Sequence, residues 1–122
     1  IEYNGINILL MGDATVNNED ILMKRYNLPK IDILKVGHHG SRTSSSKLFI
    51  KDIEPKISLI SSGKNNKYHL PNLDVIQRLK YYGSKVFDTQ DNGELTINLD
   101  EEVYIVYRDN LNQKSLARES VS

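Results

Sequence analysis

The chain has 122 residues, no cysteine and a formal net charge of zero, from 16 basic and 16 acidic residues. This length suits one domain with a modest core and excludes two. Without cysteine, disulfides and thiolate metal sites are excluded, so any metal must be held by His, Asp or Glu. The balanced charge argues against a strongly electrostatic nucleic-acid binder, although a local basic patch stays open.

The ends of the sequence suggest a piece of a larger protein. No apolar run is long enough to cross a bilayer, and no signal peptide is recognisable. The first residue is Ile1 rather than Met, and a buried-strand pattern follows almost at once. We therefore expect Ile1 to mark a boundary inside a longer chain.

Strand and helix patterns alternate in the first half of the sequence. A continuous apolar run at 6–11 predicts a strand buried on both faces, and a capped helix follows that Pro29 ends. A second strand is predicted at 31–36. The serines at 44–46 offer an N-cap for a short helix that continues to about Ile53.

The same alternation continues through the middle of the chain. Residues 56–61 are predicted as a third strand, and a polar loop follows at 62–72. Asn72 is a plausible N-cap for a helix whose C′ residue is Gly83. Residues 85–88 then form a short fourth strand. Strands that alternate with helices imply parallel crossovers and a mixed α/β sheet.

The last third of the chain changes character. Apolar segments at 95–99 and 103–107 with a polar turn between them predict a hairpin. From residue 109 onward the sequence is polar, and we expect a disordered tail.

Polar loops follow the first three predicted strands. They lie at 12–13, 37–41 and 62–66. Because the carboxyl ends of parallel strands meet at one edge of a sheet, and ligands of open α/β sheets bind there, these loops can form one site. The 62–66 loop can hold an anion through its backbone N–H groups, but by itself it is more simply a solvated loop.

Asp13 and the adjacent pair His38 and His39 are the sharpest candidates for chemistry. By itself, Asp13 is most simply a turn or capping residue, and a lone histidine pair is most often a surface accident. Together, imidazole and carboxylate without sulfur suit Zn²⁺, Mn²⁺ or iron. His69 lies in the next polar loop and by default is exposed and incidental.

Three segments in order and spacing resemble the metallo-β-lactamase-like domain of the ComEC family of competence proteins. They are LLMGDA at 9–14, ILKVGHHGS at 33–41 and ISSGKNNKY at 60–68, and the resemblance extends over 6–99. The sequence departs from the family at 69–72, where HLPN replaces the usual GHPH. A histidine on the substrate side is therefore missing or displaced to His69.

The resemblance implies an α/β fold that is half of a metallo-β-lactamase αββα sandwich, a mixed sheet with helices mainly on one face. Residues 1–108 would be the C-terminal half of that domain, and 109–122 its polar, disordered tail. The family's H-x-H-x-D-H motif, which supplies most metal ligands, occurs nowhere in this chain.

The resemblance also assigns roles to individual residues. Asp13 stands where the family has an aspartate that bridges two metal ions, and one histidine of the pair is the last metal ligand. We favour His38, and the choice between it and His39 stays open. The candidate residues are Asp13 and His38 for metal, His39 and His69 for catalysis, and Ser41, Lys64 and Asn66 for substrate binding.

The implied function is metal-dependent hydrolysis of DNA phosphodiesters by the complete domain. Its cofactor would be Zn or Mn, two ions in the complete domain, with weak or no binding and no useful activity in this chain alone. The parent would be a membrane protein for uptake of transforming DNA. This domain would lie on the extracellular side of the cytoplasmic membrane and contact DNA, its missing N-terminal half and the membrane channel portion.

Two other functions fit the sequence. One is a non-catalytic module that guides DNA or contacts the channel, and the other is a hydrolase of a small ester. Because a half-sandwich would leave one apolar sheet face uncovered, we also expect a homodimer, with two sheets pairing face to face.

Overall fold

The computed structural model describes residues 1–62, 70–99, 103–108 and 116–121. The strands in these ranges are β1 (Glu2–Tyr3), β2 (Ile6–Leu10), β3 (Ile33–Lys35), β4 (Ile57–Ile60), β5 (Lys85–Asp88), β6 (Thr96–Asn98), β7 (Tyr104–Arg108) and β8 (Leu116–Ser120). The helices there are α1 (Val16–Arg25), α2 (Lys47–Ile53), α3 (Leu73–Tyr81) and α4 (Thr89–Asn92), with a short 3₁₀ turn η1 (Gly37–Gly40).

Strands β1 to β5 form a mixed sheet in the order β1-β2-β3-β4-β5. β2, β3, β4 and β5 are parallel neighbours, and β1 pairs antiparallel with β2. The register places Leu9 beside Leu34, Leu34 beside Ser58 and Ser58 beside Val86. The predicted parallel crossovers and mixed sheet are thus confirmed.

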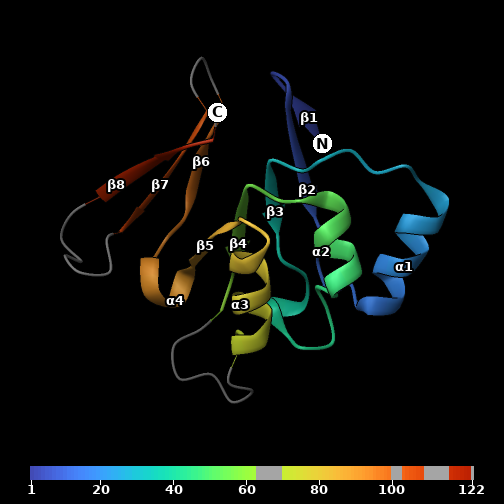
Figure 1. Cartoon of the computed structure of the whole chain (residues 1–122). Coiled ribbons are helices and arrows are strands. Elements are labelled where there is room, and N and C mark those ends of the chain that lie inside the picture. The colour runs from blue at the N-terminus through green and yellow to red at the C-terminus, as the bar shows by residue number, and fades with distance from the viewer. Residues whose placement is uncertain (63–69, 100–102, 109–115, 122) are drawn as a thin grey trace.

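Helices α1, α2 and α3 cover one face of this sheet, with α1 and α2 on the right of Figure 1 and α3 near its centre. The buried residues of this layer are Met11, Ile31, Leu34, Val36, Phe49, Ile50, Ile53, Ile60, Val75 and Leu79. Each fully buried side chain of this kind contributes roughly 1.5–3 kcal/mol through removal of apolar surface from water. In the part of the chain that the structure describes, no helix is both long and apolar enough to cross a membrane.

Strands β6, β7 and β8 form a second, antiparallel sheet that packs on the opposite face, on the left of Figure 1. The buried side chains between the two sheets are Ile8, Ile33, Ile57, Leu59, Phe87, Val103, Ile105 and Val121. The layers are therefore helices, mixed sheet and small sheet, which confirms an α/β fold with helices mainly on one face.

This small sheet alters one expectation from the sequence. The second face of the mixed sheet is not left uncovered, because β6 to β8 of the same chain pack on it. The exposed apolar face that motivated a face-to-face homodimer is therefore absent from the described residues, and a homodimer stays a prediction without that support.

The prediction of a disordered tail from residue 109 is wrong for Leu116–Ser120, which forms β8 and pairs antiparallel with β7. Ile105 of β7 faces Glu119, whose carboxylate forms an ion pair with Lys85. Val121 is 3% exposed and packs in the core between the sheets. The polar composition concealed this strand, because backbone pairing with β7 and one apolar anchor hold it. Residues 109–115 and 122 lie outside the described ranges.

The predicted signals for the start of α2 and for both ends of α3 are confirmed, whereas α1 is capped by Thr15 and ends at Arg25, before Pro29. The Asn72 side chain accepts a hydrogen bond from the Asp74 N–H at 3.0 Å, and Ser46 accepts one from Phe49 at 3.2 Å. Gly83 follows α3 with a positive φ of 89°, a conformation that glycine adopts without steric cost. These caps fix where α2 and α3 begin and where the chain turns into β5.

Candidate functional site

The carboxyl ends of the parallel strands bring the first two predicted loops into contact. The N–H of Val36 donates to the carbonyl oxygen of Leu59 at 2.9 Å, just beyond β3. The N–H of His38 then donates to the carbonyl oxygen of Gly12 at 2.7 Å. The loop that carries Asp13 therefore lies directly beside the loop that carries the histidines.

The histidines occupy a strained turn. His38 has φ 50° and ψ 41°, and His39 has φ 54° and ψ 29°, so both lie in the left-handed region. This conformation costs roughly 1–2 kcal/mol for a residue with a Cβ. The next residue, Gly40, has φ 76°, and a Cβ built on it would lie 2.7 Å from Pro71 Cβ. Strain of this kind concentrates at functional sites, which makes the turn a candidate for one.

Hydrogen bonds from neighbouring segments hold the turn in place. The buried hydroxyl of Ser44 directs its single hydrogen toward two carbonyl oxygens, that of Gly37 at 2.9 Å and that of Ser41 at 3.0 Å. The N–H of Asn72 donates to the carbonyl oxygen of Gly40 at 2.9 Å. The strained backbone is therefore fixed from both sides.

Glu19 of α1 anchors the segment that follows the turn. Its side chain is buried, and its carboxylate accepts hydrogen bonds from the N–H of Ser46 at 2.9 Å and from the N–H of Ser45. Arg78 of α3 donates to the Ser45 carbonyl oxygen at 2.7 Å. Burial raises the pKa of the Glu19 carboxyl, although the hydrogen bonds from Ser46 and Ser45 act in the opposite direction. Sequence reasoning missed this contact.

His39 is exposed and has a defined tautomer. Its Nδ1 lies 2.7 Å from the carbonyl oxygen of Ser61, at the end of β4. A carbonyl oxygen can only accept, so Nδ1 carries a proton, and the neutral form of this imidazole has its lone pair on Nε2. Histidines that bind metal usually have this arrangement, because the second hydrogen bond fixes the ring and raises its basicity.

His38 is half-buried and has an unsatisfied nitrogen. Its Nδ1 is buried and has no hydrogen-bond partner among the residues that the structure describes. A buried polar atom without a partner costs roughly 1–3 kcal/mol and requires an explanation. Both histidines are therefore suited to bind a metal ion, His39 through Nε2 and His38 through Nδ1.

The structure says less about the roles of the other predicted site residues. Asp13 is exposed on its loop. Ser41 is 8% exposed, and its hydroxyl lies 3.0 Å from Thr43 Oγ1 and accepts from the Thr43 N–H at 3.3 Å. That hydroxyl is thus engaged within its own turn, and the role of Ser41 in substrate binding stays a prediction. The remaining candidates lie outside the described residues; they are Lys64, Asn66 and His69.

These residues fit part of a metal site. One carboxylate and two imidazoles at adjoining loops match the oxygen and nitrogen ligands of Zn²⁺ or Mn²⁺, and the fixed tautomer of His39 fits the same role. In residues 1–62, 70–99, 103–108 and 116–121, however, no three His, Asp or Glu side chains lie close enough to hold an ion. A complete shell would need further ligands.

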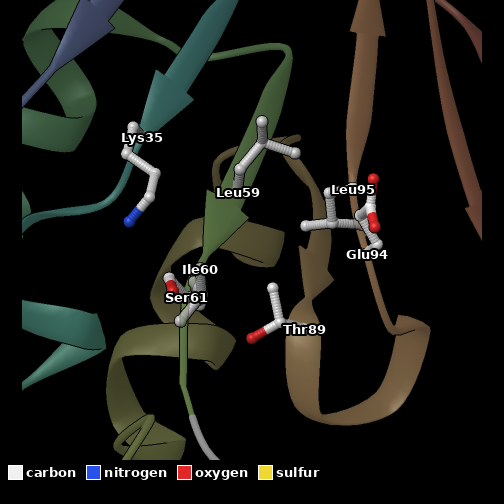
Figure 2. Close-up of a pocket in the computed structure, with 7 residues that line it drawn as sticks. All are labelled: Lys35, Leu59, Ile60, Ser61, Thr89, Glu94 and Leu95. Carbon is white, nitrogen blue, oxygen red and sulfur yellow. The ribbon is translucent and has the colours of Figure 1, made fainter.

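A pocket opens between the two sheets at the same edge (Figure 2). Its volume is about 320 Å³, and its lining residues are Lys35, Leu59, Ile60, Ser61, Thr89, Glu94 and Leu95. Lys35 is half-buried, and burial lowers the pKa of its ammonium group. Sequence reasoning did not select this lysine; the available signal was a single charge inside the apolar run ILKV.

Known proteins with similar sequences are competence and recombination proteins. No family model matches the chain. It is 40% identical over 95 residues to ComE operon protein 3 of Bacillus subtilis, and 42% identical over 91 residues to Recombination protein 2 of Haemophilus influenzae. It is 36% identical over 97 residues to Competence protein ComA of Neisseria gonorrhoeae. These matches cover 78%, 75% and 78% of the chain.

The matched region therefore places the chain in the class of competence and recombination proteins. The chain belongs to the ComEC family. It spans only 12%, 11% and 14% of the three relatives.

Proposed function

We propose that this chain is part of a metal-dependent hydrolase domain of a DNA-uptake protein, and that the domain cleaves phosphodiesters of DNA. The observation that carries the proposal is the hydrogen bond from His39 Nδ1 to the Ser61 carbonyl oxygen, which leaves Nε2 as the nitrogen that can bind a metal ion in the neutral imidazole. It lies in a strained, firmly held turn beside the loop of Asp13.

Each candidate residue would have a role in hydrolysis that fits the chemistry of its side chain. Asp13 would hold the metal through its carboxylate, and His38 or His39 through an imidazole nitrogen. A bound Zn²⁺ or Mn²⁺, or a pair of them, would lower the pKa of a bound water and neutralise charge on the phosphate. The histidine that is not a ligand, or His69, would carry a proton to the leaving oxygen. Lys64 and Asn66 would orient the substrate.

The strain of the turn supports a site rather than a surface loop. Hydrogen bonds from Ser44 and Asn72 fix its backbone before any ligand arrives. A group that is already oriented loses little entropy on binding and needs no reorganisation during the reaction. The left-handed backbone of the two histidines lowers the stability of the fold, so the fold itself gains nothing from it.

The partners of the proposed domain follow from its family. DNA would be the substrate, and the preceding half of the domain would supply the missing ligands. The membrane portion of the parent protein would place the domain on the extracellular side of the cytoplasmic membrane.

A non-catalytic module that guides DNA is the second candidate. It is favoured by one observation, the lack of a three-ligand cluster among the described residues. A hydrolase of small esters is the third, because this chemistry depends on the site and not on the fold.

The deciding experiment uses the complete domain, the chain together with its preceding half. Labelled DNA and a small chromogenic ester are offered with Mn²⁺, with Zn²⁺ and with EDTA. The proposal expects DNA cleavage that requires metal and falls about 100-fold or more in Asp13→Asn. DNA binding without cleavage would support the guiding module, and ester cleavage alone would support the third candidate.

A further inference from the structure

The pocket between the sheets has walls of different chemistry (Figure 2). Lys35 of β3 forms one wall, Glu94 and Leu95 before β6 form the opposite wall, and Leu59 of β4 lies between them. Leu59 is buried and Leu95 is half-buried, and both belong to the apolar layer between the sheets. A ligand in this pocket would meet a cation, an apolar middle and a carboxylate.

Lys35 is the cation of this pocket, and no carboxylate within the described ranges lies in ion-pair distance of it. Other lysines of the sheet are paired, Lys56 with Asp32 and Lys85 with Glu119. A half-buried ammonium without a counter-charge costs free energy that an anionic ligand would recover. A phosphate group suits this position because it supplies charge and several acceptor oxygens.

The remaining polar groups narrow the ligand further. The Thr89 hydroxyl already donates to the Ser62 carbonyl oxygen at 2.7 Å and accepts from the Ser62 N–H at 2.9 Å. Glu94, on the opposite wall, is exposed and can accept a hydrogen bond from an amino group. A ligand with a phosphate at one end, a flat apolar body and an amino-bearing edge matches this order. Nucleotides of cytosine, adenine and guanine have this structure, whereas thymine lacks the amino group.

We propose that this pocket binds one nucleotide of a DNA strand, with its phosphate at Lys35, its base between Leu59 and Leu95, and its exocyclic amino group at Glu94. The substrate class, DNA, rests on the proposed function. The volume of about 320 Å³ lies within the range of small-ligand pockets, roughly 300–1,000 Å³, and suits a single nucleotide.

The pocket adjoins the histidine turn through one residue. Ser61 lines the pocket, and its carbonyl oxygen accepts the hydrogen bond from His39 Nδ1. A nucleotide held in the pocket would therefore place a neighbouring phosphodiester toward the turn. This assigns the pocket a positioning role for the strand and a preference for bases that carry an amino group.

The test is an NMR titration of the chain in EDTA with dCMP, dTMP, deoxycytidine and inorganic phosphate as separate probes. dCMP is expected to shift the methyl signals of Leu59 and Leu95. Lys35→Met keeps the apolar stem but removes the charge; it should weaken dCMP about tenfold and leave deoxycytidine unchanged. Glu94→Gln should abolish the preference for dCMP over dTMP.

Matched controls remove the same charges elsewhere. Lys56→Met lies at the opposite end of the sheet, and Glu54→Gln is exposed on the loop after α2; neither should change binding. Equal affinities of Lys35→Met and Lys56→Met for dCMP would overturn the proposal. So would inorganic phosphate binding at Lys35 without any response to deoxycytidine, because the base would then have no site.

The titration is independent of hydrolysis because EDTA removes metal. Pocket binding in a domain that fails to cleave DNA would refute the proposed function and leave the nucleotide site intact. Metal-dependent cleavage that is unaffected by Lys35→Met, together with no dCMP shift, would refute the site and leave the function.

Discussion

At the amino-terminal end of the parallel strands, charged groups are satisfied. Lys56 Nζ lies 3.2 Å from Asp32 Oδ1, and the N–H of Asn7 donates to Asp32 Oδ2 at 2.8 Å. At the carboxyl end, Lys35 has no partner in the described part of the chain, and His38 Nδ1 is buried without one. The same sheet is therefore built for stability at one end and retains unsatisfied groups at the other.

This difference shows that the destabilising groups of the fold lie at the carboxyl end of the parallel strands. Left-handed histidines, an orphaned nitrogen and a half-buried ammonium all lie along one edge. Natural sequences retain such conflicts mainly at functional sites. Removal of each conflict should therefore stabilise the chain, and removal of the contacts that hold the strained turn should destabilise it.

We expect the largest effect on stability from Glu19, which holds the segment after the histidine turn, and not from a residue of the candidate site. Glu19→Ala removes the carboxylate that accepts from Ser45 and Ser46, which leaves two backbone N–H groups without their partner and opens a cavity beside α1. We expect a loss of about 3 kcal/mol in the free energy of unfolding, measured by urea denaturation. The neighbouring Asp20→Ala should change it by no more than about 0.5 kcal/mol. Equal losses in the two variants would contradict the anchor.

The same carboxyl should give a pH dependence. Because its folded-state pKa is raised above 4.5, the folded chain holds this proton more tightly than the unfolded chain. Its contribution is complete below pH 4.5 and declines as pH rises through the folded-state pKa. Unfolding free energies of the wild type minus those of Glu19→Gln should therefore fall as pH rises. A difference that grows with pH would show that the hydrogen bonds outweigh burial.

His38→Gly should stabilise the chain by about 1 kcal/mol. The substitution relieves a left-handed backbone and removes the unsatisfied nitrogen, while the greater entropy of the unfolded glycine offsets part of the gain. Thermal unfolding measures the change as a rise in Tm. A clear fall in Tm would show that His38 makes a stabilising contact.

Lys35→Met should also stabilise the chain near neutral pH, by a smaller amount. The pKa of Lys35 is lowered below 10.5, so protonation at lower pH costs the folded state more than the unfolded state. The advantage of the methionine variant should shrink as pH rises toward 10.5. A constant advantage across this range would mean that packing, and not desolvation of the ammonium, is its cause.

The elements that local chemistry determines could be predicted from the sequence. The apolar runs indicated the parallel strands, and Asn72 and Gly83 indicated the ends of α3. Because parallel strands end at the same edge of a sheet, their order was enough to predict that the loop of Asp13 lies beside the loop of the histidines. The strand β8 could not be predicted, because its stability comes from pairing with β7 and from Val121 in a distant core.

The finer geometry of the site depends on contacts between distant residues. Glu19 meets residues 26 and 27 positions later, and the hydrogen bond of His39 to Ser61 spans 22 positions. Neither contact has a local sequence signal. The pocket at Lys35 needs both sheets in place, so strand patterns alone could not show it.

The most direct test of the account measures DNA cleavage and unfolding free energy in parallel for two variants of the complete domain. His39→Asn removes the imidazole but keeps a residue that tolerates the left-handed backbone, and Lys56→Met alters the opposite end of the sheet. We predict that His39→Asn lowers the cleavage rate at least about 100-fold with stability within about 1 kcal/mol, while Lys56→Met leaves cleavage unchanged. Full cleavage by His39→Asn would contradict the claim that this edge holds the chemistry.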